Sequence, residues 1–183
     1  MDFNQLIYKR QSVRQYTDKK VEREKIDLCL EAGRMAPSAC NSQPWTFVVI
    51  DDDTIKEQVA SATYNSVVSF NKFSHQAPVI VAVVMESVNL TSKIGTKSTD
   101  IDYGFIDLGI AVEHFCLQAA DIGLGTCILG WFQAEKIKKI LEIPKNRKIG
   151  LLITLGYAKE DTIRVKNRKQ IDDMSFNNKY CKK

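Results

Sequence analysis

Apolar side chains recur at intervals of three and four residues along much of the chain, which is the spacing of an amphipathic helix. In the second such stretch, Ile26, Cys29, Gly33 and Ala36 fall on one face. We therefore expect helices over residues 2–10, 21–35, 53–62, 101–122 and 135–141, the third of them capped by Asp53.

Four shorter stretches have the composition of β-strands, and we expect strands over residues 45–50, 79–85, 124–131 and 149–157. The second follows Pro78 and is an unbroken apolar run, which predicts burial on both of its faces. Strands and helices mix without strict β-α-β alternation, so the predicted fold class is α+β with a mixed sheet.

The longest expected helix, residues 101–122, is apolar around more than one face. A helix of this kind lies either in the centre of the core or at a contact between subunits. It is preceded by the polar residues 87–100, and a polar stretch of that length typically forms a lid or a disordered excursion.

The composition is that of one globular domain over residues 1–183, since 44% of its residues are hydrophobic and 26% are charged. The longest apolar run is too short to cross a bilayer, and the first residues lack the features of a signal peptide, so we expect a cytoplasmic protein. A formal charge of +4 suits small phosphate-bearing molecules but is too diffuse for nucleic acid.

The five cysteines are odd in number and include no Cys-x-x-Cys pair, which argues against a disulfide framework and against a zinc site. Cys29 and Cys116 fall on apolar helical faces, so we expect them to be buried. Cys40 lies in a polar loop and is a candidate for oxidation.

That loop, residues 37–44, separates an expected helix from an expected strand and begins and ends with proline. Ser38 and Asn41 offer hydrogen-bond donors and acceptors without bulk. A stiff polar loop of this kind suits a flat, heteroatom-rich ligand, but the same pattern is also typical of a well-capped turn.

A second candidate binding segment lies just after the first helix. If residues 10–14 are extended, Arg10, Ser12 and Arg14 share one side, and two guanidinium groups with a hydroxyl match a phosphate and its tether. The alternative is a solvated basic turn. The basic residues 164–169 are likewise either solvated or a second source of charge for the same phosphate.

Neither a phosphate-binding glycine loop nor a Ser/His/Asp, Cys/His, metal-ligand or paired-carboxylate arrangement stands out in the sequence. Positive charge and polar loops without acid–base machinery indicate that a bound cofactor performs the chemistry. At the end of the third strand, Leu129 and Gly130 would bring backbone N–H groups close to a planar ligand.

Together, three segments resemble motifs of the nitroreductase family of FMN-dependent oxidoreductases, in the family's order. Residues 10–14 resemble its N-terminal phosphate-binding motif, residues 36–45 its flavin-ring loop, and residues 110–127 its long interface helix with the following turn. The resemblance implies an α+β sandwich with a largely antiparallel sheet, and an obligate homodimer with FMN at the subunit interface. It also implies that the arm from about residue 159 to 183 packs on the partner subunit.

The cofactor-binding residues implied by the resemblance are Arg10, Gln11, Ser12, Arg14, Pro37, Ser38, Asn41, Asn71, Leu129, Gly130 and Arg168. Arg10, Ser12 and Arg168 would hold the phosphate and ribityl chain, and Arg14 would stabilise the anionic reduced ring. Gln11 stands where the family frequently has arginine, which removes one positive charge near the cofactor.

The ring itself would be approached from two subunits. The resemblance assigns residues 37, 38 and 41 to the partner subunit, the backbone of residues 129 and 130 to the reactive N5 atom, and Asn71 to the pyrimidine edge. The implied activity is a ping-pong transfer of hydride from NADH or NADPH through the flavin to a nitroaromatic, quinone or similar flat acceptor. The alternatives are a specialised oxidative or dehalogenating flavoenzyme of the same family and a non-catalytic flavin-binding module.

Overall fold

The computed structural model describes residues 1–89 and 100–181. Its elements are, in chain order, α1 (Phe3–Lys9), α2 (Arg23–Arg34), η1 (Ala39–Asn41), β1 (Trp45–Ile50), α3 (Asp53–Ala60), η2 (Lys72–Gln76), β2 (Val79–Met85), α5 (Tyr103–Asp121), β3 (Gly125–Leu129), α6 (Ala134–Ile140), β4 (Lys148–Gly156) and η3 (Ile171–Asp173). We expected a lid or a disordered excursion over residues 87–100, and most of that stretch, residues 90–99, lies outside the described residues.

The four strands form one sheet in the order β1-β2-β4-β3, and every neighbouring pair is antiparallel. In addition, Ser12, which lies outside these strands, forms an isolated parallel bridge with Thr126 of β3. The α+β class with a largely antiparallel sheet is therefore confirmed.

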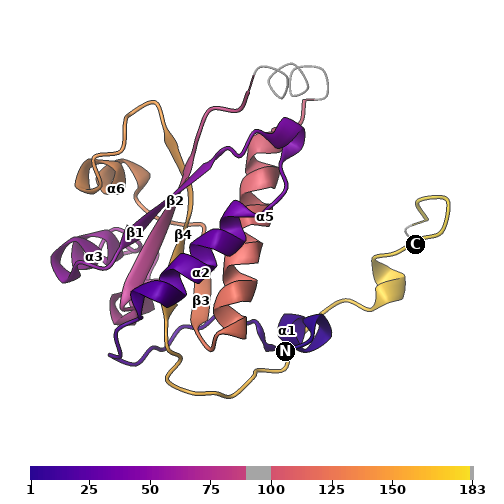
Figure 1. Cartoon of the computed structure of the whole chain (residues 1–183), viewed down its shortest axis with the longest axis horizontal. Coiled ribbons are helices and arrows are strands. Elements are labelled where there is room, and N and C mark those ends of the chain that lie inside the picture. The colour runs from indigo at the N-terminus through magenta and orange to yellow at the C-terminus, as the bar shows by residue number, and fades with distance from the viewer. Residues whose placement is uncertain (90–99, 182–183) are drawn as a thin grey trace.

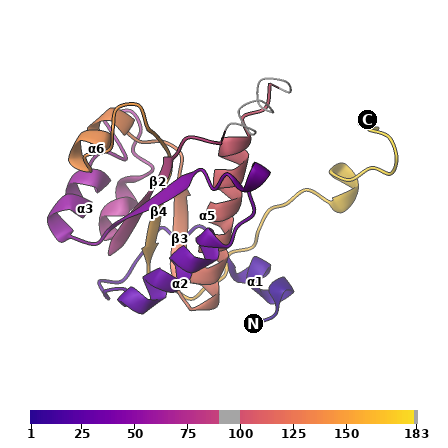
Figure 2. The same ribbon diagram turned by 45° about the horizontal axis from the view of Figure 1, so that its top comes forward.

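Helices cover both faces of this sheet, as Figures 1 and 2 show, with α2 and α5 on one face and α3 and α6 on the other. Along β2 the side chains alternate between two cores: Val81 and Val83 pack toward α2 and α5, whereas Ile80 and Ala82 pack toward α3 and α6. The expected burial of this strand on both faces is confirmed.

The N-terminal cap of α3 differs by one residue from the sequence prediction. Asp52, not Asp53, is the cap: its Oδ1 accepts hydrogen bonds from the backbone N–H groups of Thr54 and Ile55, at 3.0 and 2.9 Å. Asp53 is already helical, so its side chain runs along the helix surface toward Lys56, 3.7 Å away. Three consecutive aspartates offer the same chemistry, and the sequence alone did not separate them.

Cys29 and Cys116 are buried as expected, and desolvation raises the pKa of each thiol to about 12. They are therefore inert as nucleophiles at neutral pH. Cys40 is exposed.

Helices α1 and α5 both leave apolar surface uncovered. Helix α1 buries none of its residues, and Phe3 is 66% exposed. Helix α5 packs Leu108 and Phe115 into the core, but Phe105 and Ile106 on its other side are 43% and 51% exposed. The expected apolar surface around more than one face of this helix is confirmed.

From residue 159 onward the chain is an extended arm, and its end lies beyond α1 in Figure 1. All of its described residues are exposed except Lys166, which is half-buried. Over the ranges 1–89 and 100–181, no helix combines the length and the apolar character that crossing a membrane requires.

Candidate functional site

The segment between α1 and α2 lies beside the edge strand β3. The backbone N–H of Val13 donates to the carbonyl of Thr126 at 2.8 Å, next to the bridge between Ser12 and Thr126. Gly125 permits this approach, because a Cβ atom there would lie 2.6 Å from Val13 Cγ2. The extended conformation predicted for residues 10–14 therefore follows from a close contact with the sheet.

Beside this segment is a cavity of about 310 Å³, which we call the cationic pocket. Its lining consists of Arg10, Gln11, Ser12, Arg14, Arg164, Val165, Lys166, Asn167 and Arg168. The structure thus brings five of the sequence-predicted site residues into one place, although they come from opposite ends of the chain.

Little negative charge balances the cationic pocket. Arg10 Nε lies 3.3 Å from Glu113 Oε1, but the buried Nε–H makes no hydrogen bond with any residue that the structure describes. The pKa of Lys166 is lowered by desolvation and by repulsion from Arg10, Arg168 and Arg164. Like charges held this close favour an anion among them.

The arm is held against its own body at this pocket. Gln11 Nε2 donates to the carbonyl of Thr162 at 2.9 Å, and Gln11 Oε1 accepts from the backbone N–H of Arg164 at 3.1 Å. Arg164 also donates from Nη2 to the carbonyl of Ser12, and Lys166 donates from Nζ to the carbonyl of Tyr8. Gln11 therefore joins the N-terminal segment to the arm.

Sequence reasoning gave an individual binding role in the arm to Arg168, and it considered Arg164 and Lys166 only as part of the basic residues 164–169, either solvated or a second source of charge for the same phosphate. The signal was present, because cations at positions 164, 166 and 168 alternate with Val165 and Asn167. In an extended chain, alternate residues share one side. Treating residues 164–169 as a single basic run concealed that alternation.

The polar loop, residues 37–44, has an unusual backbone. Cys40, Asn41 and Gln43 have positive φ angles of 53°, 50° and 45°. For a residue other than glycine such a conformation costs about 1–3 kcal/mol and persists only where neighbouring groups hold it. One such contact is the hydrogen bond from the backbone N–H of Gln43 to Ser38 Oγ, at 2.9 Å.

The loop is anchored to α5 by Asp107, a residue that sequence reasoning did not single out. Both carboxylate oxygens of Asp107 accept from the backbone N–H of Ala39, at 3.1 Å each. Within one chain, Pro37, Ser38 and Asn41 are not part of the lining of the cationic pocket. The structure therefore does not bring these three predicted residues, within one chain, to the five predicted residues that line the cationic pocket.

A third group of predicted residues lies beyond the end of β3. Asn71 is buried, and its Nδ2 donates to the carbonyl of Trp131 at 3.0 Å, directly after Gly130. The ring centroid of Phe73 lies 6.0 Å from the guanidinium carbon of Arg14. Element η2 thus connects Arg14 with the backbone that follows β3.

Gly130 and Leu129 differ in exposure. Leu129 is buried in the core between the sheet and helices α3 and α6. Gly130 is exposed, and a Cβ atom at its position would meet no atom within 4 Å. The backbone at this position is therefore open to an approaching planar group.

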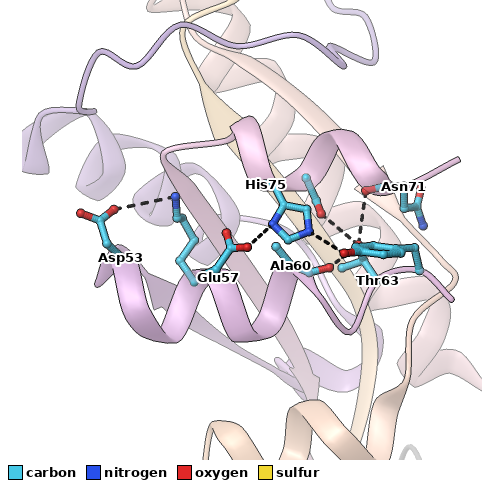
Figure 3. A network of polar contacts seen from close by, with 9 residues as sticks. Asp53, Glu57, Ala60, Thr63, Asn71 and His75 are labelled. Atoms are coloured by element: carbon cyan, nitrogen blue, oxygen red, sulfur yellow. Dashed lines mark hydrogen bonds and ion pairs between the residues drawn. The ribbon is translucent and has the colours of Figure 1, made fainter. Parts of the chain in front are cut away.

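A polar network fixes η2 on α3 (Figure 3). His75 Nδ1 lies 2.6 Å from Glu57 Oε1, and its Nε2 lies 3.1 Å from the hydroxyl of Tyr64. Thr63 Oγ1 and Ser74 Oγ are hydrogen-bonded at 2.9 Å in the buried part of the network. His75 therefore has a structural role, and it holds the segment that carries Asn71 and Phe73.

A search of the described residues finds no group of three or more histidine, cysteine, aspartate or glutamate side chains that could hold a metal ion. The arrangement instead offers a cationic pocket, a backbone edge open to a flat group and a strained polar loop. These features suit an anionic ligand with a planar ring.

Comparison with known proteins agrees with this chemistry. The family model described as "Nitroreductase family" matches residues 7–157. This range includes the segment 10–14, the polar loop, α5 and β3, and it ends before the cationic residues of the arm.

Two relatives carry the name "Putative NADH dehydrogenase/NAD(P)H nitroreductase". The protein of Archaeoglobus fulgidus is 28% identical, over 85% of this chain and 85% of its own length. That of Methanothermobacter thermautotrophicus is 30% identical, over 88% of this chain and 80% of its own length. Among solved structures, a nitroreductase family protein from Clostridium novyi NT is 29% identical with a TM-score of 0.77, and the match covers 90% of this chain and 89% of that one.

Proposed function

The chain belongs to the nitroreductase family, and on that premise we propose that it is an FMN-dependent oxidoreductase that uses NADH or NADPH. The observation that carries the proposal is the cationic pocket, in which Arg10, Ser12 and Arg168 meet from distant parts of the sequence. Without such a convergence, the chain would have no place for a phosphorylated cofactor.

The pocket fits the phosphate of FMN by its chemistry. The buried Nε–H of Arg10 makes no hydrogen bond among the described residues, and the pKa of Lys166 is lowered, so the pocket carries more positive charge than Glu113 balances. A phosphate group supplies acceptors for several guanidinium and ammonium donors at once. Arg10, Ser12 and Arg168 hold the phosphate and ribityl chain in this proposal, and Gln11 keeps the arm in place beside them.

The isoalloxazine ring would lie toward the end of β3. When bound, FMN supplies reversible two-electron chemistry between NAD(P)H and an acceptor. Arg14 contributes a fixed positive charge that stabilises negative charge on the ring's pyrimidine side, and Asn71 contributes an amide to the same side. The open backbone at Gly130, next to the buried Leu129, lets the reactive edge of the ring approach the chain closely.

We also propose that the site is completed by a second copy of the chain. Pro37, Ser38 and Asn41 are absent from the cationic pocket of their own chain, and this separation supports their contact with the partner's flavin. The uncovered apolar side chains of α1 and α5 supply surface for a homodimer. The arm from about residue 159 would pack on the partner subunit.

The proposed reaction is a ping-pong transfer in which NAD(P)H and a nitroaromatic, quinone or similar flat acceptor use the same face of the ring in turn. A specialised reaction on one metabolite and flavin binding without turnover are the alternatives. All three share the cofactor site and differ in what oxidises and reduces it.

The test is a sequence of three measurements on the purified protein. FMN binding should saturate at about one FMN per chain. Anaerobic addition of NADH or NADPH should then abolish the visible absorbance of the bound flavin. A panel of flat acceptors is then added to the reduced protein. Failure to bind FMN contradicts the proposal, whereas bound FMN that neither nicotinamide reduces favours one of the alternatives.

A further inference from the structure

We propose that Asp107 is the positioning residue that holds the polar loop, residues 37–44, in the shape needed to meet the flavin. This inference rests on the proposed function for the identity of the ligand. Its structural part, that one carboxylate holds the loop, rests on the geometry of the chain alone.

Asp107 is unusual because it is buried without a cationic partner. It is 4% exposed, and it is the one aspartate or glutamate among the buried side chains of the described residues. None of the ion pairs between described residues includes it. A carboxylate removed from water needs hydrogen bonds in compensation, and here the donor is the backbone N–H of Ala39.

The position of that donor gives the contact its effect. Ala39 is the first residue of η1 and stands between Ser38 and Cys40, where the backbone enters the left-handed region. Anchoring its N–H fixes the peptide plane just before the strained residues. The orientation of Ser38 and Asn41 therefore depends on the anchor.

The other side-chain contacts of the loop lie at the surface. Asn89 donates from its backbone N–H to Ser42 Oγ at 2.7 Å and from Nδ2 to the carbonyl of Cys40 at 2.8 Å, but Asn89 is exposed. Exposed hydrogen bonds compete with water and constrain a segment less than buried ones do. The hydrogen bond from Ala39 to the buried carboxylate of Asp107 therefore constrains the loop more than these surface contacts do.

The same helix also supports the cationic pocket. Glu113, six residues after Asp107 on α5, lies beside Arg10. Helix α5 therefore carries one acidic side chain for each half of the proposed site. With a flavin held between two copies, the loop and the pocket are set by the same rigid element.

The first test measures the loop in the protein without FMN. Asp107→Leu keeps the size of the side chain and removes the acceptor, so amide hydrogen exchange over residues 38–42 should accelerate about 10-fold or more relative to β1. Asp107→Asn keeps one carbonyl acceptor and should fall between this variant and the wild type. Asp121→Asn is the matched control, because Asp121 is an exposed aspartate of the same helix, paired with the N-terminus at 3.7 Å.

Unchanged exchange in the loop, or an equal acceleration throughout the molecule, overturns the positioning role. If Asp107→Leu does not fold, the comparison of Asp107→Asn with Asp121→Asn decides the question by the same criterion.

The second test measures the bound flavin. The visible circular dichroism of FMN should change in Asp107→Leu and largely recover in Asp107→Asn, while FMN affinity falls by less than in a variant of the cationic pocket. A spectrum identical to the wild type overturns the proposal. If the wild-type protein itself does not bind FMN, the proposed function fails, and the exchange measurement still decides whether Asp107 holds the loop.

Discussion

Arg10 Nε and Glu113 Oε1 lie 3.3 Å apart, in a geometry that leaves the buried Nε–H without a hydrogen bond. Glu113 therefore orients the guanidinium by charge but does not satisfy it. Arg10 also lines the cationic pocket, together with Arg14 and Arg168. An arginine held in this way is prepared for an anion.

Replacing Arg10 tests the pocket directly. Arg10→Ala removes a charge-assisted contact of about 1.5–3 kcal/mol with the phosphate, so FMN should bind roughly 10- to 100-fold more weakly. Arg23→Ala is the control, because Arg23 is an exposed arginine whose 2.9 Å ion pair with Asp27 lies on α2. Equal affinities of the two variants, measured by fluorescence titration, would show that the phosphate is bound elsewhere.

Lys166 should show opposite effects on stability and on binding. Its pKa is lowered in the folded chain by burial and by three arginines, so at neutral pH its charge opposes folding, and this penalty disappears only as pH rises through the lowered pKa. Lys166→Met should therefore raise the thermal midpoint of the FMN-free protein while weakening FMN binding. The exposed Lys169 provides the control, Lys169→Met. A lower midpoint for Lys166→Met without FMN contradicts the prediction.

Glu22 should titrate far below an ordinary glutamate. Its pKa is lowered from 4.5 to about 2, chiefly by the hydrogen bond from the Tyr157 hydroxyl at 2.5 Å. The associated stability is present above the unfolded-state pKa of 4.5 and is lost as pH falls toward about 2. NMR titration of the side-chain carboxyl checks the value. Tyr157→Phe should move it upward more than Lys19→Gln does, and an unmoved pKa in Tyr157→Phe assigns the shift to another cause.

Gly125 should tolerate no side chain while Val13 remains. In Gly125→Ala, the new methyl group would lie 2.6 Å from Val13 Cγ2, so the segment carrying Arg14 must move away from β3. Overpacking of this kind costs about 1–3 kcal/mol of unfolding free energy. Urea denaturation measures the loss, and adding Val13→Ala should recover part of it. A double variant no more stable than Gly125→Ala would exclude this contact as the cause.

A charge on the uncovered side of α5 should separate the proposed dimer. Ile106 is 51% exposed, and Ile106→Glu would place a carboxylate in an apolar interface. The prediction is a shift to monomer in sedimentation velocity together with weaker FMN binding. Ile55→Glu, on α3 at the other side of the sheet, is the matched control. A wild-type protein that is already monomeric contradicts the dimer itself.

The sequence predicted strands well where burial left a single interpretation. The ranges 45–50 and 79–85 match β1 and β2, because short runs rich in β-branched and aromatic residues that follow a proline have few alternatives. The cap of α3 was misplaced by one residue, since Asp52 and Asp53 are chemically identical and only the backbone distinguishes them.

The site was harder to predict because its contacts join distant segments. Periodicity placed Arg10, Ser12 and Arg14 on one side, but it could not show that Arg164 and Lys166 would fold against them. Asp107 was missed for a different reason. An acid within a largely apolar helix is normally taken as solvent-facing, and only the tertiary structure places Ala39 beside Asp107.

Asp107 and Glu113 also limit how α5 can change in length. At about 100° per residue, the six-residue step from Asp107 to Glu113 places them roughly 120° apart around the axis, facing different segments. Inserting or deleting a single residue in that interval would turn one acid by about 100° away from its target, whatever the inserted side chain. Substitutions in this interval are tolerated wherever packing allows, but the number of residues between Asp107 and Glu113 has to stay the same.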